Sequence, residues 1–354
     1  MKKRGLSEVV TTLILVLLVL VAIAIVWVVI SNLIRDKGDD IGSSTFEVSM
    51  AVKTVEPSST SGNVLVRVER NVGGGNLQGI NIILSDGVKS VTKKVDPLDE
   101  GEETTYDISK DDLGAITKVS IRPIGGSEGN EKVGEVVGER KLSYDQSVKS
   151  LGGLIAWWKL DGDAKDATGN GHDGTNNGAT FVDGKVGKAA DFDGVNDYIA
   201  IGGTPINLAT DWSASFWVYI KIESAGQGIL TKPVSPITSL IMNRDSSVTP
   251  PRYYPCFIVS PNGCARPNGE TLSYQGRWIH IVMSHDTNGF HSYNNGESMP
   301  ANPHSVGYAG GSNLNPTQIG RYSTATINGQ LDELAIFNRA LTADEVKSIY
   351  ELTK

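Results

Sequence analysis

The feature that most constrains this chain is a long apolar segment near its start. Residues 13–30 are Leu, Ile, Val and Ala with a single Trp, and residues 9–34 carry no charge. A run of this length can cross a bilayer as a helix, because a helix satisfies its backbone polar groups internally. The basic residues at positions 2–4 favour a cytoplasmic start. We therefore expect a membrane anchor, with the rest of the chain delivered outside the cell.

The kind of apolar segment decides how the protein is displayed. A secretory signal peptide has a shorter core and a small-residue cleavage site, which this segment lacks. The order Lys-Arg-Gly-Leu-Ser-Glu sets a glycine between the charges and the apolar run, and it resembles the class III signal sequence of archaeal type IV pilins. The resemblance implies that a prepilin peptidase cuts between Gly5 and Leu6. An uncleaved, monomeric signal anchor is the alternative.

This resemblance divides the start of the chain into a prepilin leader at residues 1–5 and a transmembrane or pilin helix at residues 6–35. Without its basic leader, the helix could leave the lipid and bundle with other pilin subunits, since apolar side chains on every face suit both environments. Glu8 is the candidate assembly residue. It would be third in the mature chain, whereas bacterial-type pilins carry a glutamate at the fifth position.

Composition narrows what the outer part can be. At 354 residues the chain has room for two outer domains. Its net charge of −8 and its pI near 5.2 argue against nucleic-acid binding, which needs a basic surface. Many of its 40 glycines follow asparagine, and Asn-Gly is the strongest short signal for a β-hairpin. The outer part is therefore expected to be all-β.

Residues 45–142 predict a small β-sandwich. Apolar and polar residues alternate in residues 64–69, which is typical of a strand with one buried face. Further short strands are indicated at 45–55, 80–84, 90–95, 104–108 and 116–123. By its position after the apolar helix, this segment resembles a pilin head domain.

Residues 153–354 contain several blocks in a characteristic order. A Trp-Trp strand comes first, an Asp/Asn/Gly-rich loop follows, and Ser-Phe-Trp-Val-Tyr-Ile, Gly-Arg-Trp-Ile-His and Asn-Gly-Gln-Leu-Asp-Glu come later. This set resembles the laminin-G-like, concanavalin A-like jelly-roll domains of lectins and adhesins. The resemblance implies two antiparallel sheets, one of them concave, and rim loops that bind a carbohydrate or a surface protein.

Domains of this type often carry a structural calcium ion where the first and last strands meet. Ca²⁺ needs six to eight oxygen ligands from carboxylates, amides and carbonyls. The alternative is that these Asp, Asn and Gly residues simply form turns. The expected ligands lie in one loop and in the last strand, and they are Asp161, Asp166, Asn170, Asp173 and Asp332.

The sequence predicts no catalytic residues and therefore no enzyme. Glucanases share the jelly-roll architecture, but they need two carboxylates on one face of a sheet. Asp332 and Glu333 are adjacent, so a regular strand would point them to opposite faces. His280 is expected to be a packing residue. Tyr253, Tyr254 and Tyr293 could stack on sugar rings or merely fill the rim.

Two local features complete the prediction. Cys256 and Cys264 flank a Pro-Asn-Gly turn in an extracellular context, which favours a disulfide that fixes a long loop. Thr342 and Glu345 form a capping box that begins a final short helix, with Leu341 and Val346 in position to pack together. We expect that helix to lie on the edge of the sandwich.

The predicted protein is mainly β, with an N-terminal transmembrane or pilin α-helix, a small β-sandwich head and a C-terminal concanavalin A-like jelly roll. We expect a pilin-like protein that displays a lectin-like domain for adhesion, anchored in the membrane with its domains extracellular, on the cell surface or on a pilus. Expected partners are prepilin peptidase, other pilin subunits and a carbohydrate or surface-protein ligand, but not nucleic acid. A monomeric signal-anchored surface lectin and a surface glycoside hydrolase are the alternatives.

Overall fold

The computed structural model describes residues 48–354, with gaps at 60–61, 73, 128, 209–210, 222–226, 233–237, 246–251, 260–262, 266–274, 301–314 and 324. The predicted leader and apolar helix, with Gly5, Leu6 and Glu8, lie outside the described residues. Within the described residues, no helix has both the length and the apolar character needed to cross a bilayer.

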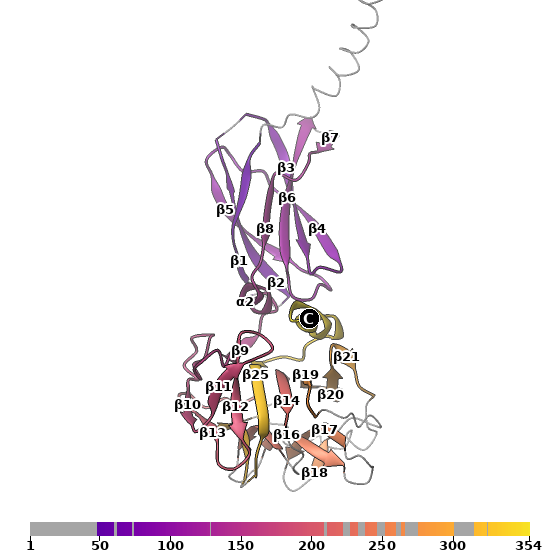
Figure 1. Cartoon of the computed structure of the whole chain (residues 1–354). Coiled ribbons are helices and arrows are strands. Elements are labelled where there is room, and N and C mark those ends of the chain that lie inside the picture. The colour runs from indigo at the N-terminus through magenta and orange to yellow at the C-terminus, as the bar shows by residue number, and fades with distance from the viewer. Residues whose placement is uncertain are drawn as a thin grey trace, which may run out of the picture.

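The described chain forms two β-rich bodies with two short helices between them (Figure 1). The first, which we call the N-terminal sandwich, covers residues 48–142. A three-stranded sheet in the order β1-β2-β5 faces a five-stranded sheet in the order β4-β3-β6-β7, with β8 also paired to β6. The strands are β1 (Met50–Pro57), β2 (Asn63–Arg70), β3 (Leu77–Ser85), β4 (Ser90–Val95), β5 (Glu103–Ser109), β6 (Lys118–Ser127), β7 (Asn130–Val133) and β8 (Gly138–Lys141).

The second body is a jelly roll whose eight-stranded sheet we call the front sheet. Its order is β11-β12-β25-β14-β19-β20-β21, with β9 also paired to β25. The first and last strands of this body therefore lie side by side. The strands are β9 (Leu154–Trp158), β11 (Thr180–Asp183), β12 (Lys188–Asp193), β14 (Trp212–Ile220), β19 (Trp278–Asp286), β20 (Gly289–Asn294), β21 (Glu297–Ser298) and β25 (Asn328–Phe337).

The seven-stranded partner of the front sheet, which we call the back sheet, has the order β10-β13-β22-β15-β16-β17-β18. A separate hairpin pairs β23 (Arg321–Tyr322) with β24 (Ala325–Thr326). The back-sheet strands are β10 (Gly174–Asn177), β13 (Tyr198–Ile201), β15 (Gln227–Lys232), β16 (Thr238–Asp245), β17 (Arg252–Val259), β18 (Gly263–Ala265) and β22 (Gln318–Ile319). The prediction of a mainly β chain with a jelly roll is confirmed.

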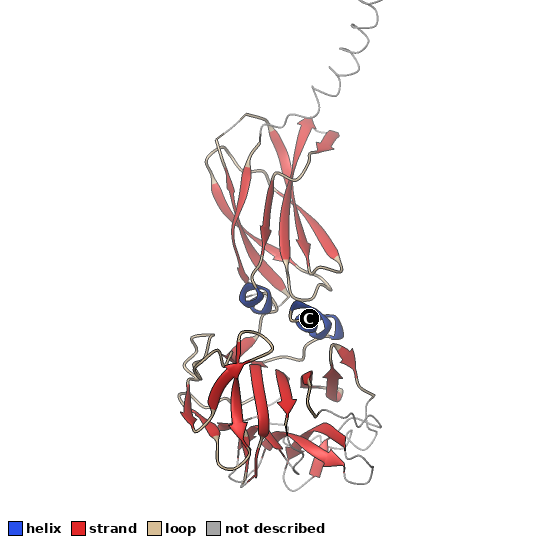
Figure 2. Ribbon diagram, in the orientation of Figure 1, coloured by secondary structure: helices blue, strands red, loops and turns tan. Residues whose placement is uncertain are grey.

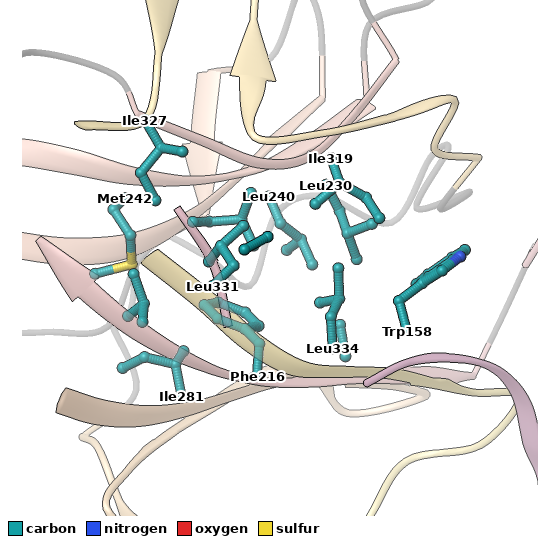
Figure 3. Packing of buried hydrophobic residues seen from close by; sticks show 14 of the residues in the cluster. Trp158, Phe216, Leu230, Leu240, Met242, Ile281, Ile319, Ile327, Leu331 and Leu334 are labelled. Atoms are coloured by element: carbon teal, nitrogen blue, oxygen red, sulfur yellow. The ribbon is translucent and has the colours of Figure 1, made fainter. Parts of the chain in front are cut away.

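Side-chain alternation along the strands separates the core from the outer faces. In β14 the even-numbered residues from Trp212 to Ile220 join the core between the two sheets, and the odd-numbered residues face outward. Apolar burial between the sheets supplies most of the driving force for this packing. Figure 3 shows part of this core, including Trp158, Phe216, Leu230, Leu240, Ile319, Leu331 and Leu334.

Two helices lie between the bodies (Figure 2). Helix α2 (Tyr144–Lys149) lies between the two predicted domains, and it begins with a capping box of Ser143 and Gln146. That Ser-x-x-Gln spacing is a start signal that the sequence analysis did not use. Helix α3 (Ala343–Leu352) begins with the predicted capping box of Thr342 and Glu345.

Helix α3 does not lie on the edge of the jelly roll as expected. Its apolar residues Val346 and Ile349 pack on the outer face of the front sheet, against a cluster that includes Trp157 and Phe337. Ala115 of the N-terminal sandwich belongs to the same cluster. One short helix therefore contributes to the contact between the two bodies.

A buried charged contact fixes α3 to both bodies. The Lys110 ammonium of the N-terminal sandwich lies 2.9 Å from Glu345 Oε1, and the Arg339 guanidinium lies 2.7 Å from Glu345 Oε2. The Lys110 and Glu345 side chains are 3% and 6% exposed. The backbone N–H of Ala115 also donates to the hydroxyl of Ser348, at 2.7 Å.

The pKa of Glu345 reflects this contact. Burial by itself would raise the pKa, but the hydrogen bonds and charges of Arg339 and Lys110 outweigh it and lower the pKa to about 2. Burial lowers the pKa of Lys110. Since the folded pKa of Glu345 is depressed, its contribution to stability is present above about pH 4.5 and is lost as the pH falls towards about 2.

We predict that Glu345→Ala lowers the free energy of unfolding by about 3–5 kcal/mol, because the buried Lys110 and the half-buried Arg339 lose their anion. Lys110→Ala should cost less, since Arg339 still pairs with Glu345. Lys89→Ala is the control, because it breaks an exposed pair with Asp344 of the same helix. Denaturant titration measures all three, and equal effects of Glu345→Ala and Lys89→Ala would contradict the prediction.

Candidate functional site

A row of polar and aromatic side chains crosses the outer face of the front sheet. Strand register places Asp191 of β12 beside Gln330 of β25, Gln330 beside Tyr219 of β14, and Tyr219 beside Trp278 of β19. All four residues are half-buried. The Tyr219 and Trp278 rings lie 5.7 Å apart between centroids, at 57° to each other. We call these four residues the open row.

The open row combines two kinds of recognition chemistry. The aromatic rings offer apolar surfaces with fixed geometry. The Gln330 amide supplies both hydrogen-bond donors and acceptors, and the Asp191 carboxylate supplies acceptors. Asp191 also pairs with the ammonium of Lys221 at 2.5 Å, which holds the carboxylate in place. Such a surface suits a ligand that has both apolar patches and hydroxyl groups.

A second row, which is buried, crosses the same face two residues before Tyr219 on β14. Trp217 is paired with His280 of β19 and with Asp332 of β25. These three residues are 2%, 1% and 0% exposed. We call them the covered row. The Tyr350 ring of α3 lies against it, and the ammonium of Lys185 lies 4.8 Å from the centroid of the Trp217 ring.

Several polar atoms of the covered row are unpaired within the described residues. They are Trp217 Nε1, His280 Nδ1 and Asp332 Oδ1. The other histidine nitrogen, Nε2, lies 2.9 Å from the hydroxyl of Ser215. The other carboxylate oxygen, Asp332 Oδ2, accepts the backbone N–H groups of Lys185 and Val186 at 2.8 and 2.9 Å. Burial lowers the pKa of His280 to about 3 and raises that of Asp332 to about 7.

The expectation that Asp332 and Glu333 point to opposite faces is wrong. Leu331 and Leu334 both enter the core between the sheets, so the two residues between them stay outside it. The reason is a β-bulge in β25. The register of β25 against β14 breaks at this point, and Glu333 has a positive φ of 53°. The indole N–H of Trp157, on the outer face of β9, donates to Glu333 Oε2 at 2.7 Å.

The two carboxyl groups therefore share one face of the front sheet. Burial and the neighbouring carboxylate of Asp332 raise the pKa of Glu333 to about 9. The raised pKa favours the neutral form of the Glu333 carboxyl group. Burial, together with the neighbouring Glu333 carboxyl group, also raises the pKa of Tyr144 in α2. A neutral carboxyl group beside a second carboxyl group is an arrangement that can supply a proton to a substrate.

The residues predicted as calcium ligands are used mostly as turn formers. The Asp166 carboxylate accepts backbone N–H groups of Trp157, Thr168 and His172. Asp173 accepts the backbone N–H of Asp166, the Asn170 amide donates to the Ile155 carbonyl, and Asp161 accepts the N–H of Lys188. Asp332 lies on the covered row.

No metal centre emerges from this arrangement. Among the residues that the structure describes, no group of three or more His, Cys, Asp or Glu residues could hold a metal ion. The described carboxylates of the loop accept the N–H groups that shape its turns. Calcium binding stays a prediction from the sequence resemblance.

Of the remaining predicted residues, the cysteines and tyrosines fall outside the two rows, and His280 lies in the covered row. Cys256 is disulfide-bonded, and Cys264 is the only other cysteine of the sequence. Tyr253, Tyr254 and Tyr293 are buried, so these rings pack inside the protein instead of forming an exposed rim. His280 is buried as expected for a packing residue.

Sequence reasoning missed the open row, although part of its signal was present. The block Ser-Phe-Trp-Val-Tyr-Ile alternates, and that alternation sets Trp217 and Tyr219 on one face of a strand. Trp278 lies in a second quoted block. No local pattern could show that Gln330 and Asp191 lie beside them, because cross-strand register is set by the whole sheet.

Solved structures similar to this chain include enzymes and a toxin domain. Domain 4 of AbnA, a GH43 extracellular arabinanase from Geobacillus stearothermophilus, is 21% identical over 56% of this chain and 98% of its own, with a TM-score of 0.43. A Trypanosoma rangeli sialidase is 12% identical over 86% of this chain and 53% of its own, with a TM-score of 0.41. The binding domain of botulinum neurotoxin DC is 14% identical over 57% of this chain and 52% of its own, with a TM-score of 0.40.

The prediction that the protein is not an enzyme is overturned. Glycoside hydrolases occur among the similar structures. The sequence argument for that prediction also fails, since Asp332 and Glu333 do share a face. At these identities and TM-scores, no residue role is transferred from the similar structures to this chain.

A family model gives the more specific comparison. Residues 193–347 match the model of the concanavalin A-like lectin/glucanases superfamily. No curated protein matches the chain. The matched residues include β14, β19 and β25, which carry most of the open and covered rows. The jelly-roll fold of the second body thus agrees with the similarity of residues 193–347 to concanavalin A-like lectins and glucanases.

Proposed function

We propose that the jelly roll binds carbohydrate at the open row and that the N-terminal apolar segment displays it at the cell surface. The observation that carries the proposal is the pair of half-buried rings, Tyr219 and Trp278, set beside Gln330 and Asp191 on a concanavalin A-like sheet. A sugar ring has apolar C–H faces and hydroxyl groups at its edge. The Tyr219 and Trp278 rings can pack on the C–H faces, and the Gln330 amide and the Asp191 carboxylate can bond the hydroxyl groups.

Display on a pilus is supported by the sequence of residues 1–35 alone. In this proposal a prepilin peptidase removes residues 1–5, and the remaining helix joins other pilin subunits through contacts that include Glu8. The jelly roll then projects from a filament and adheres to glycans. A permanent, monomeric anchor would display the same domain without a filament, and a surface protein is the alternative ligand.

We predict that Tyr219→Ala and Trp278→Ala each weaken glycan binding at least about tenfold, or about 1.4 kcal/mol. The cause is loss of the aromatic surface on which a sugar ring packs. Tyr198→Ala is the matched control, because Tyr198 is also half-buried but belongs to β13 of the back sheet. A glycan array that includes arabinotriose and sialylated sugars identifies ligands, and calorimetry measures their affinities.

The Tyr198→Ala control separates a loss specific to the open row from a general loss of binding. Equal losses in Tyr198→Ala and Trp278→Ala would place binding elsewhere on the jelly roll. A wild-type protein that binds no sugar on the array, but does bind surface proteins, would replace the carbohydrate proposal with the alternative ligand class.

Glycoside hydrolysis is a second candidate function, favoured by the shared face of Asp332 and Glu333. A glycosidase uses one carboxylic acid to protonate the leaving oxygen and a second carboxylate as nucleophile or base. The raised pKa of Glu333 suits the acid. Asp332, whose pKa is about 7, would be the second group.

We predict that, if the jelly roll hydrolyses glycans, Glu333→Gln and Asp332→Asn each reduce sugar release at least about a hundredfold, the scale typical of losing a general acid or base. Gln330→Ala on the same strand is the control for an effect on binding. Reducing-sugar assays on the array ligands measure the rates. Full activity in both carboxyl variants would remove these residues from the chemistry.

We predict that the mature protein begins at Leu6, as cleavage after Gly5 requires. N-terminal sequencing of protein from native membranes measures this directly. Gly5→Val should retain the leader and prevent incorporation into filaments, which electron microscopy of purified surface appendages would show. An intact Met1 in the wild-type protein would favour the monomeric anchor.

A further inference from the structure

The covered row has an aromatic ring of the protein itself stacked on it. The Tyr350 ring lies 5.8 Å from the Trp217 ring at an interplanar angle of 29°, and 6.2 Å from the His280 ring at 27°. Both contacts are stacked, whereas Trp217 and His280 are tilted at 41° to each other. A flat ring therefore rests across the two aromatic side chains of the covered row.

Hydrogen-bonding capacity under this ring is unused. Trp217 Nε1, His280 Nδ1 and Asp332 Oδ1 have no partner among the described residues, and all three side chains are almost fully buried. Buried polar atoms in native proteins normally have partners, so three unpaired atoms in one row need an explanation. Tyr350 offers the row an apolar ring but does not satisfy these donors and acceptors.

The covered row continues the open row. Trp217 and Tyr219 both point outward from β14 two residues apart, which corresponds to about 7 Å along a strand. His280 and Trp278 are spaced in the same way on β19, and Asp332 and Gln330 on β25. Each position of the covered row thus has a counterpart in the open row, including one aromatic residue on β14.

We propose that the covered row is a second carbohydrate subsite, which Tyr350 fills in the absence of ligand as an internal substitute for a sugar ring. This inference rests on the proposed function of the open row. When a longer oligosaccharide binds, its next ring displaces Tyr350 and stacks on Trp217. Its hydroxyl groups pair with the unsatisfied atoms of Trp217, His280 and Asp332.

The placement of Tyr350 allows this exchange without loss of the helix. Tyr350 lies in the last turn of α3, whereas the contacts that fix α3 to both bodies come from Glu345 and Ser348. Helix ends open at lower free energy than helix interiors. Gly296 lies against the Tyr350 ring, and a Cβ there would lie 3.2 Å from Tyr350 Cδ1. The glycine therefore leaves room for the ring beside the β20–β21 turn.

The test compares full-length wild type with Tyr350→Ala and with Tyr350→Phe, which keeps the ring. The probes are arabino-, gluco-, galacto- and sialo-oligosaccharides of two to six units, titrated by calorimetry. Tyr350→Ala should bind the longer members at least fivefold more tightly than wild type does, and Tyr350→Phe should match wild type. Adding Trp217→Ala to Tyr350→Ala should abolish the gain.

Thermal unfolding checks that Tyr350→Ala retains a cooperative fold. If it does not, Trp217→Phe tests the residue on which the sugar ring is proposed to stack. The expected result is a selective loss of affinity for the longer sugars. Equal affinities of wild type and folded Tyr350→Ala across the panel, with Tyr219→Ala still weakening binding about tenfold, would overturn the subsite and leave the proposed function standing. Failure of every protein to bind any sugar would overturn both.

Discussion

The position of Glu345 determines how the rest of the molecule is arranged. Its carboxylate receives Lys110 from the N-terminal sandwich and Arg339 from the jelly roll, while it also closes the capping box of α3. A buried carboxylate needs charged partners, and the observed position of α3 gives Glu345 both cations. The helix is thereby fixed between the two bodies, and the second half of the helix is placed on the front sheet.

That placement divides the front sheet into two regions. Where α3 and the Lys185 loop lie over the sheet, Trp217, His280 and Asp332 are buried. Beyond the helix, the same three strands present Tyr219, Trp278 and Gln330 half-buried. The chemistry of the two rows is similar, so the difference between them is access. The contact of Glu345 that places α3 therefore also limits how much of the front sheet is accessible.

One prediction failed because it treated a local pattern as complete. Regular alternation placed Asp332 and Glu333 on opposite faces, but β25 bulges where it pairs with β14, and both carboxyl groups face outward. Only the pairing of β25 with its neighbour β14 decided between a regular strand and a bulge. The carboxylates of the acidic loop accept N–H groups of their own turns, and calcium binding there stays a prediction.

The sequence by itself determined what short-range physics controls: the alternating strands, the hairpins at Asn288-Gly289 and Asn295-Gly296, the capping box of Thr342 and Glu345, and the ordered blocks of a jelly roll. Apolar periodicity and capping are written within a few residues of one another, so they can be read locally. Only the tertiary structure decided the place of α3, the bulge at Glu333 and the row of Asp191, Gln330, Tyr219 and Trp278. Lys110 and Glu345 are 235 residues apart in the chain, and contacts of that range follow from the packing of whole sheets, which no local pattern specifies.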